Sequence, residues 1–414
     1  MRINDEEKAM LAGELGEPRR WAISHQLQVG RFFDAEDFVP VTQAHIMGDT
    51  ESLGESGVAF LEQLATAGIQ DRRVRIPTIT DPRGLDLSTY HRLKQTETMA
   101  SLEVRASAAL EAFGVLMTNT CINYQTVFPA TLGEHLAMGD TGVVIYSNSV
   151  MGARSNFEGG PSALAAGLTG RTPRYGYHLD RFRHASRQIV VQEQPMDLSD
   201  WGALGGMVGK LANSYWEVPV VDGLLAVPTS DQLKHFGAAL ASFGSVALFH
   251  IPGITPECRK VADVVEGSIP EALSITRDDY DAFYASYAAR GEKVDVVVFA
   301  APQLSLFELQ QLADLIGDKK IHPETSLLVA TSPEIKQAAD RMGLTGRIEQ
   351  SGAILLSGVC FYQSYAREMA EANGWKRLMS NSAKLINIIG GYGYLPTLGT
   401  TERCVASAIK GTIV

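Results

Sequence analysis

Short, almost continuous apolar runs separated by amphipathic helical patterns most constrain the fold of this 414-residue chain. A run such as "KVDVVVFAAP" at 293–302 has no polar face, which is typical of a strand buried on both sides of a parallel sheet. Such strands need covering helices, and helical patterns occur between them, as at 230–243 and 305–317. The sequence therefore predicts an α/β fold with mostly parallel sheets. The runs interpreted as strands are 74–80, 113–120, 141–149, 187–194, 246–253, 293–302, 326–332 and 352–360.

The sequence marks its domain boundaries only weakly. The first 70 residues carry helical patterns, and Asn4 is placed to cap the first helix. Proline-containing stretches near 219–230 and 252–257 are possible joints. We expect a mainly helical N-terminal part at 1–70 that packs on the first α/β domain. The remaining expected parts are α/β domains at 71–220 and 221–345 and a C-terminal part at 346–414 that returns to the functional site.

Charge and terminal composition narrow the function classes. The formal net charge is −11, and no Lys/Arg-rich tract with interleaved aromatics occurs, so nucleic-acid binding is not expected. A small anionic substrate stays compatible, because a site needs only a few local cations. No apolar run reaches the roughly 18 residues of a membrane-spanning helix. The N-terminus is acidic and lacks an apolar signal core, so we expect a cytoplasmic protein.

Several predicted strands end in small polar residues and, twice, in a cysteine. In open parallel sheets, ligands bind beyond the carboxyl ends of the strands, where Cys121 and Cys360 are expected. Cys404 lies near the start of the last predicted helix, and Cys258 is interpreted as structural. Three thiolates on an iron–sulfur cluster would leave one iron open to substrate. The spacing alone does not separate that hypothesis from four buried apolar thiols.

The stretch from Tyr146 to His178 combines more polar groups and glycines than a core segment needs. Ser147, Asn148 and Ser149 close a predicted strand, and Arg154 is suited to holding a carboxylate bidentately. Glu158, Gly159 and Gly160 precede a helix that starts at Pro161, whose first amides form an anion site. This pattern predicts a substrate-facing wall. A tight turn with a surface Arg154–Glu158 pair explains the same residues.

Two shorter motifs carry further candidates. In "GEHLAMGD", Glu134 and His135 resemble half of a metal or acid–base pair, but no second histidine follows at the zinc-protease spacing. A structural role, such as holding Glu134 against the 146–178 stretch, is equally compatible. In "MSNSAK", Ser382 and Lys384 are suited either to capping a helix or to contacting an anion.

These segments together resemble the aconitase X family, a dehydratase branch of the aconitase superfamily. The resemblance is carried by "TNTC" (118–121), "GEH" (133–135), "NSVMGARSNFEGGPSALAAGLTGRTPRYGYH" (148–178), "MSNSAK" (379–384) and "ERCVASAIKG" (402–411). It also includes "PVTQAHIMGDTESLGESG" (40–57) and "GITPE" (253–257), and so runs over nearly the whole chain. The sequence departs from the family around Cys360, after Lys384 and after Cys121, which affects the expected substrate more than the expected cofactor.

The resemblance implies three-layered α/β/α domains of the aconitase kind. It also implies an iron–sulfur cluster, [4Fe-4S] or [2Fe-2S], held by Cys121, Cys360 and Cys404. The cluster would act as a Lewis acid on a leaving hydroxyl group. The family's swivelling domain has no counterpart in this chain, so a small swivelling-domain subunit is an expected partner in a heterodimer.

The implied reaction is loss of water from a small hydroxy acid. We expect cis-3-hydroxy-L-proline to be converted to 1-pyrroline-2-carboxylate. Mevalonate 5-phosphate is the alternative substrate, with Arg171 and Arg174 as candidates for its phosphate. A non-catalytic binding subunit of the same fold is a third hypothesis. Ser382 and Lys384 stand as candidate catalytic residues, and a base from the partner subunit is the other possibility.

Overall fold

Parallel strands dominate this computed structural model, which describes residues 1–268 and 271–414. The strands are β1 (Phe38–Pro40), β2 (Ala44–Ile46), β3 (Thr78–Thr80), β4 (Ala137–Met138), β5 (Arg171–Pro173), β6 (Arg187–Val191), β7 (Pro219–Asp222), β8 (Ala272–Ile275), β9 (Val296–Leu304), β10 (Ser326–Thr331), β11 (Ile354–Ser357), β12 (Arg377–Ser380) and β13 (Leu395–Leu398). They form parallel sheets of order β3-β2-β4, β7-β6-β8 and β11-β10-β9-β12-β13, and an antiparallel pair, β1-β5.

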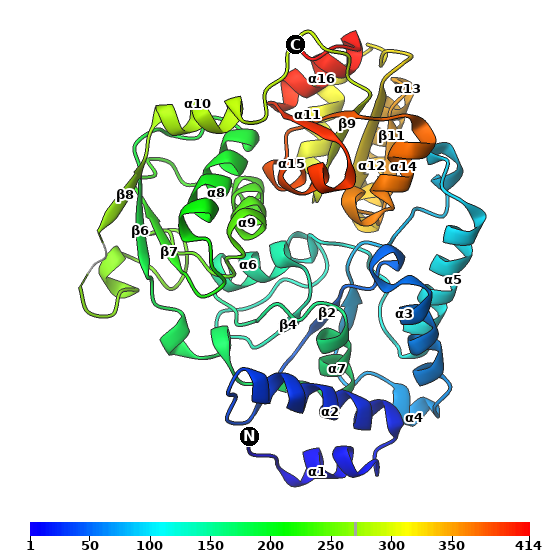
Figure 1. Cartoon of the computed structure of the whole chain (residues 1–414), viewed down its shortest axis with the longest axis vertical. Coiled ribbons are helices and arrows are strands. Elements are labelled where there is room, and N and C mark those ends of the chain that lie inside the picture. The colour runs from blue at the N-terminus through cyan, green and yellow to red at the C-terminus, as the bar shows by residue number, and fades with distance from the viewer. Residues whose placement is uncertain (269–270) are drawn as a thin grey trace.

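Helices pack against these sheets. They are α1 (Asp5–Ala12), α2 (Glu17–Phe32), α3 (Thr50–Ala65), α4 (Ile69–Arg72), α5 (Glu97–Ala112), α6 (Thr141–Ser149), α7 (Pro161–Thr169), α8 (Leu198–Ala212), α9 (Ser230–Gly244), α10 (Arg277–Ala285), α11 (Leu306–Ile316), α12 (Pro333–Arg341), α13 (Leu344–Gln350), α14 (Ala366–Asn373), α15 (Ala383–Ile389) and α16 (Thr401–Lys410). The β7-β6-β8 sheet lies at the left edge of Figure 1, with α8 and α9 on its inner side. Among the described residues, no helix has the length and apolar character of a membrane span.

The five-stranded sheet shows why its strands lack a polar face. Every residue of β9 is buried, and neighbouring residues of a strand point to opposite sides of the sheet. Val297 and Phe299 pack in a core with α11, α13 and α16, whereas Val296 and Val298 pack in the core that includes α15 and α9. Helices therefore cover both faces, and the predicted three-layered α/β/α arrangement is confirmed.

Much of the predicted element pattern is confirmed. Strands occupy most of the expected runs at 187–194, 293–302 and 326–332, shorter strands lie within 352–360 (β11) and 74–80 (β3), and the expected helices are α9 and α11. The N-terminal part is mainly helical, and Asn4 caps α1 in a capping box with Glu7. The division at 70, 220 and 345 stays a prediction, although the five-stranded sheet takes strands from both sides of residue 345.

Three predicted strands are wrong or reduced. The run at 141–149 is helix α6, which begins where Asp140 accepts hydrogen bonds from the amides of Gly142 and Val143. Because α6 is buried on nearly every side, it lacks the polar stripe that marks a surface helix. The run at 246–253 contributes a single bridge, between Val220 and His250, and 113–120 contributes one between Ile79 and Leu116.

The sheets meet at their carboxyl ends. The amide of Thr120 donates to the carbonyl of Thr80 at the end of β3, over 3.0 Å, and the amide of Arg83 donates to Gly358 beyond β11, over 2.9 Å. The amide of Cys121 donates to the side chain of Gln303 near the end of β9, over 3.2 Å. Segments far apart in sequence therefore converge where ligand sites of parallel sheets are expected.

Candidate functional site

Two of the predicted cysteines lie side by side at this convergence. Cys121 follows the segment that is hydrogen-bonded to β3, and Cys360 follows β11; both are buried. A hydrogen bond with the Cys360 thiol lowers the pKa of Cys121. Burial, together with the same contact, raises the pKa of Cys360 well above its usual range. Such a pair is suited to losing its protons to a soft metal that both sulfurs bind.

A buried ion pair lies beside the cysteines. Lys384, in the first turn of α15, places its ammonium nitrogen 3.2 Å from a carboxylate oxygen of Asp140 and 5.6 Å from the centre of the Tyr362 ring. Burial opposes the charge of Lys384, but the negative charges of Asp140 and the cysteines raise its pKa. Lys384 therefore stays a cation, which suits it to stabilising negative charge in the site.

Asp81 and His45 complete the buried set. Burial, followed by the charge of Asp140, raises the pKa of Asp81 well above its usual value, and burial lowers that of His45. His45 Nε2 lies 2.8 Å from the Thr120 carbonyl and 3.5 Å from Asp81 Oδ1. One Asp81 oxygen accepts from Gln363, while Oδ1 is buried without a hydrogen-bond partner among the described residues. An unpaired buried oxygen of this kind needs a ligand or a proton.

Arg83 supplies a second cation at the same edge. It follows β3, and its backbone pairs with the Gly358–Val359 segment just before Cys360. Its Nε is buried without a hydrogen-bond partner, and its guanidinium makes no salt bridge with any residue that the structure describes. Glu103 lies near but already accepts from Thr50 and from the Gly84 amide. Arg83 is thus available for an anion.

Cys404 does not join the pair, contrary to the prediction from the resemblance. It lies on α16 in the apolar layer between that helix and the five-stranded sheet, with Met379 and Val405, and its sulfur faces the carbonyl of Gly399 at 3.7 Å. Burial raises the pKa of this thiol, so it stays protonated. The side-chain direction from a helix start cannot be read from spacing, and Cys404 has the environment of a structural cysteine.

The small polar residues of the predicted wall are structural. Asn148 donates to the carbonyls of Ser155 and Ala247 and accepts from the Ser155 amide. Ser149 accepts from the amide of Phe249, and Ser147 is buried within the same helix. Because 141–149 is a helix, these side chains join α6 to neighbouring segments, and no strand end presents them to a ligand.

The rest of the 146–178 stretch also has internal partners. Arg154 pairs with Asp180 at 2.5 Å, and buried Glu158 accepts from Thr172 at 2.9 Å, so the expected Arg154–Glu158 pair is wrong. Pro161 begins α7 as predicted. Gly159 has φ +60°, and a Cβ on Gly160 would lie 2.6 Å from the Met47 carbonyl. The glycines therefore permit close backbone approach between α7 and the end of β2.

The hydrogen bonds that the side chains of Glu134 and His135 make with described residues do not involve the two cysteines. The Glu134 side chain accepts from Thr42, Gln43 and Thr131, whereas its backbone carbonyl accepts from the Arg154 amide at 2.8 Å, so the backbone holds Glu134 against the 146–178 stretch. The side chain of His135 contacts that stretch, because its Nδ1 lies 2.9 Å from Nδ1 of His178. Burial and then the nearby arginines lower the pKa of His135. The two rings therefore share one hydrogen bond as neutral imidazoles.

Ser382 and Lys384 have different roles. The Ser382 hydroxyl caps α15 by accepting from the amide of Leu385, and it donates to the carbonyl of Ala301. The capping alternative therefore describes Ser382, and Lys384 alone lies at the cysteine pair. The sequence reasoning missed Asp81, Arg83 and Asp140. Asp81 follows the predicted strand 74–80 directly, so the rule that pointed to Cys121 would also have found it.

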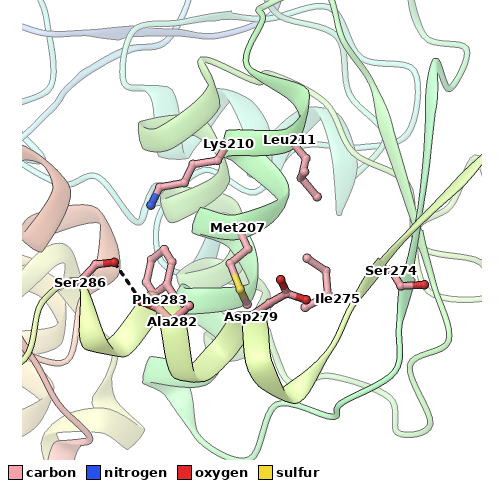
Figure 2. A pocket seen from close by; sticks show the side chains of 9 residues that line it. All are labelled: Met207, Lys210, Leu211, Ser274, Ile275, Asp279, Ala282, Phe283 and Ser286. Atoms are coloured by element: carbon pink, nitrogen blue, oxygen red, sulfur yellow. Dashed lines mark hydrogen bonds between the residues drawn. The ribbon is translucent and has the colours of Figure 1, made fainter.

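The surface hollows lie outside this buried set. The hollow between α8 and α10, of about 300 Å³, contains Lys210 with its nitrogen 4.9 Å from the centre of the Phe283 ring (Figure 2). None of the site residues lines it. A hollow of about 470 Å³ comes nearer, because Ile122 and Gln125, just after Cys121, contribute to its wall.

The cysteines and the free carboxylate oxygen of the site can be compared with the ligands that an iron–sulfur cluster needs. Cys121 and Cys360 fit two thiolate ligands of one metal centre, and the unpaired oxygen of Asp81 lies in the same buried set. A cluster held by Cys121, Cys360 and Cys404 does not fit this arrangement. Among the described residues, no group of three or more His, Cys, Asp or Glu side chains is already arranged around a metal position.

Comparison with known proteins matches almost the whole chain. Family models described as aconitase X first, second and third domains match residues 1–181, 185–285 and 294–410. The phosphomevalonate dehydratase large subunit of Methanocaldococcus jannaschii is 34% identical over 391 residues, which cover 93% of this chain and 94% of that protein. The cis-3-hydroxy-L-proline dehydratase of Pseudomonas aeruginosa is 31% identical over 99% of this chain and 70% of its own length.

A solved structure has the same architecture. The holo-form crystal structure of aconitase X from Thermococcus kodakaraensis superposes with a TM-score of 0.88 and 27% identity, covering 99% of this chain and 100% of that one. The similarity therefore extends over all three groups of parallel strands.

Proposed function

Because the chain belongs to the aconitase X family of dehydratases, we propose that it is a hydro-lyase that removes water from a small hydroxy carboxylic acid at the Cys121–Cys360 pair. The observation that carries this proposal is the burial of two adjacent thiols with a lysine cation at the carboxyl ends of parallel strands. An iron–sulfur cluster is general in aconitase-like proteins. Bound here by Cys121 and Cys360, it would supply Lewis acidity toward the departing hydroxyl group.

The chain's own residues would bind and orient the substrate. Arg83, which lacks an ion-pair partner among the described residues, is our candidate for the substrate carboxylate. Lys384 is placed to stabilise the negative charge that develops when the α-proton leaves. The Ser382 hydroxyl is held by its cap bond from Leu385 and by its donation to the Ala301 carbonyl, so we assign the base to the partner subunit or to Asp81 rather than to Ser382.

We favour cis-3-hydroxy-L-proline as the substrate, converted to 1-pyrroline-2-carboxylate. A phosphorylated substrate needs further cations, and the two predicted for it are engaged elsewhere. Arg171 pairs with Glu7 at 2.7 Å and Arg174 with Asp37 at 2.6 Å, on the side of the N-terminal helices. Mevalonate 5-phosphate is the second candidate, because the relatives with 34% identity are named phosphomevalonate dehydratase large subunits.

A direct comparison of the two substrates tests this proposal. The chain is purified anaerobically, reconstituted with iron and sulfide, and mixed with its small subunit. Each substrate is then followed in D₂O for α-proton exchange and for loss of water. We expect turnover of cis-3-hydroxy-L-proline, and Arg83→Met should raise its KM more than it lowers kcat. Turnover of mevalonate 5-phosphate alone would overturn the substrate assignment, and turnover of neither would overturn the proposed function.

The partner is proposed to be a small subunit, as the names of the relatives imply. Five large apolar side chains are 79–85% exposed, which is unusual for a free surface, and all but Phe32 lie outside the N-terminal helices. We group the other four and call them the apolar rim: Met196, Leu225, Val227 and Phe307. Met196 and Phe307 line one hollow of about 350 Å³, and Phe307 also borders the hollow that includes Ile122 and Gln125. A subunit on this rim would lie next to the segment that follows Cys121.

A further inference from the structure

One buried amide links the loops that carry both site cysteines. Gln303 is the next-to-last residue of β9 and is fully buried. It is neither a charged group nor a metal ligand, and it was not among the residues singled out from the sequence. Its position is defined by β9, the central strand of the five-stranded sheet, which makes it one of the most firmly placed side chains at the site.

The side chain of Gln303 makes hydrogen bonds to both of these loops and to the end of β10. Nε2 lies within hydrogen-bonding distance of three carbonyls, those of Asn119 (3.1 Å), Val359 (3.2 Å) and Thr331 (3.3 Å). Oε1 accepts from the amide of Cys121 at 3.2 Å. An amide has two N–H hydrogens and a carbonyl oxygen, so every donor and acceptor of this group is engaged.

These contacts fall immediately beside the thiols. Asn119 and the Cys121 amide bracket the turn that presents the first thiol, and Val359 directly precedes Cys360. In addition, the backbone N–H of Gln303 donates to the sulfur of Cys121 at 3.5 Å. Because the two cysteine loops belong to different sheets, nothing in their own hydrogen bonding fixes their spacing as directly as this shared amide.

Gln303 is itself anchored from the opposite side. The backbone carbonyl of Gln303 accepts from the ammonium group of Lys234 at 3.2 Å. Lys234 is buried on α9 and pairs with the buried carboxylate of Glu308 on α11. Glu308 also caps its own helix with Ser305. The backbone of Gln303, whose side-chain amide joins the two loops, is therefore held in place by the Lys234–Glu308 ion pair between the helices on either side of β9.

We propose that Gln303 is a positioning residue that sets the separation of the Cys121 and Cys360 sulfurs, so that both can bind one metal centre. This inference rests on the proposed function only in taking the thiol pair as the metal site. Partners that orient metal ligands typically change metal affinity about 10- to 100-fold when they are removed. Gln303 would act in this way through the backbone of both ligands at once.

The test measures metal binding and requires no catalytic assay. Metal-free protein is titrated with Cd²⁺, and binding is followed by the thiolate-to-metal absorption band. Gln303→Met keeps the volume and removes the side-chain hydrogen bonds, and we expect it to weaken Cd²⁺ binding about 10- to 100-fold. Gln303→Glu keeps the shape but replaces the donor with a carboxylate facing three carbonyls, so it should weaken binding at least as much.

The control is another buried glutamine with the same kind of contacts. Gln26, on α2, donates to the carbonyl of Arg171 at 2.5 Å and accepts from Thr169 at 3.0 Å. Gln26→Met should lose a comparable amount of thermal stability and bind Cd²⁺ like the wild type. All titrations are made below the unfolding transition, which circular dichroism establishes for each variant.

The outcomes separate the two proposals. If Cys121→Ser abolishes Cd²⁺ binding while both Gln303 variants bind like the wild type, the positioning role is overturned and the metal site stands. If Cys121→Ser and Cys360→Ser bind Cd²⁺ like the wild type, the thiol pair is not the metal site and the proposed function fails with it. Equal losses in the Gln303 and Gln26 variants would reduce Gln303 to a general packing residue.

Discussion

At the scale of single residues, the three predicted cysteines divide into a pair and an outlier. Cys121 and Cys360 influence each other's protonation, whereas Cys404 is a buried, protonated thiol in an apolar layer. We therefore expect Cys121→Ser and Cys360→Ser each to lose most of the iron after anaerobic reconstitution. Cys404→Ser should retain it, while losing about 1–3 kcal/mol of stability because a polar hydroxyl replaces the thiol in an apolar layer.

Iron per chain and visible absorbance measure this difference, and denaturant unfolding measures the stability cost. Loss of iron in Cys404→Ser to the same extent as in Cys121→Ser would show that the protein rearranges to bring Cys404 to the site. Retention of iron in all three variants would remove the cysteines from the site altogether.

Glu158 shows how a residue that the sequence assigned to substrate can be tested as a structural one. Burial raises its pKa from the ordinary 4.5 to about 7. Below pH 4.5 both the folded and unfolded states hold the proton. Between 4.5 and about 7 the unfolded chain releases it first, so stability falls as pH rises through this window, by on the order of 3 kcal/mol.

Glu158→Gln should remove that loss while keeping an acceptor for Thr172. We expect the variant to be more stable than the wild type at about pH 8 and similar to it at about pH 4.5. Denaturant unfolding across this range gives the measurement, with Glu111→Gln on the surface of α5 as a control that should show no such window. A variant with much weaker substrate binding and unchanged stability would instead support the sequence-based assignment.

The sequence identified residue types better than residue surroundings. Lys384 was placed at the site by its motif, and Pro161 and Asn4 were placed correctly because capping depends on local backbone chemistry. Asp81 and Asp140 were missed because they belong to the site only through the strand ends that lie next to each other in the fold. That placement depends on sheet order, which single-chain patterns do not specify.

At the scale of elements, the errors follow from one ambiguity. A fully buried helix and a fully buried strand both lack a polar face, so α6 was interpreted as a strand. β9, β10 and β11 of the five-stranded sheet escaped this ambiguity, because they alternate with helices that carry a clear polar stripe, such as α11 and α12, whereas β12 and β13 were not predicted. A buried run without such neighbouring helices, as at 141–149, could therefore not be assigned to helix or strand from its pattern.

The packing of α8 against α9 gives a prediction at this scale. Figure 1 shows the two helices side by side, and glycines allow their backbones to approach. A Cβ on Gly205 would lie 2.2 Å from the carbonyl of Phe236. We expect Gly205→Ala to force the helices apart and to lower the stability by at least about 1–3 kcal/mol.

Gly346, in helix α13, is the matched control, because a Cβ there would meet no atom within 4 Å. Gly346→Ala should stabilise the protein by up to about 1 kcal/mol through helix propensity. Denaturant unfolding of both variants checks the pair. A Gly205→Ala variant as stable as Gly346→Ala would mean that α8 and α9 are not packed as closely as described.

At the scale of the whole molecule, the site lies where the β3-β2-β4 sheet and the five-stranded sheet meet, and exposed apolar side chains lie on one surface beside it. The apolar rim is 79–85% exposed, although soluble proteins rarely leave several large apolar side chains together at such exposure. The relatives are named phosphomevalonate dehydratase large subunits, and a small subunit is the partner that we propose for this chain. We therefore expect the tagged chain, purified from its native host, to retain an equimolar polypeptide that matches the small subunits of these relatives.

Phe307→Glu should abolish this association, because it places a charge on the rim beside both hollows that Phe307 lines. Ile69→Glu is the control, since Ile69 is 57% exposed on α4 and is no part of the rim. Both substitutions replace an exposed apolar side chain with glutamate. A difference in small-subunit binding between the two variants therefore reports where the substitution lies and not which residue it introduces. Sedimentation of the purified complexes gives the stoichiometry. If Phe307→Glu keeps the small subunit and Ile69→Glu loses it, the partner binds the N-terminal helices, and a residue from it would not reach the cysteine pair.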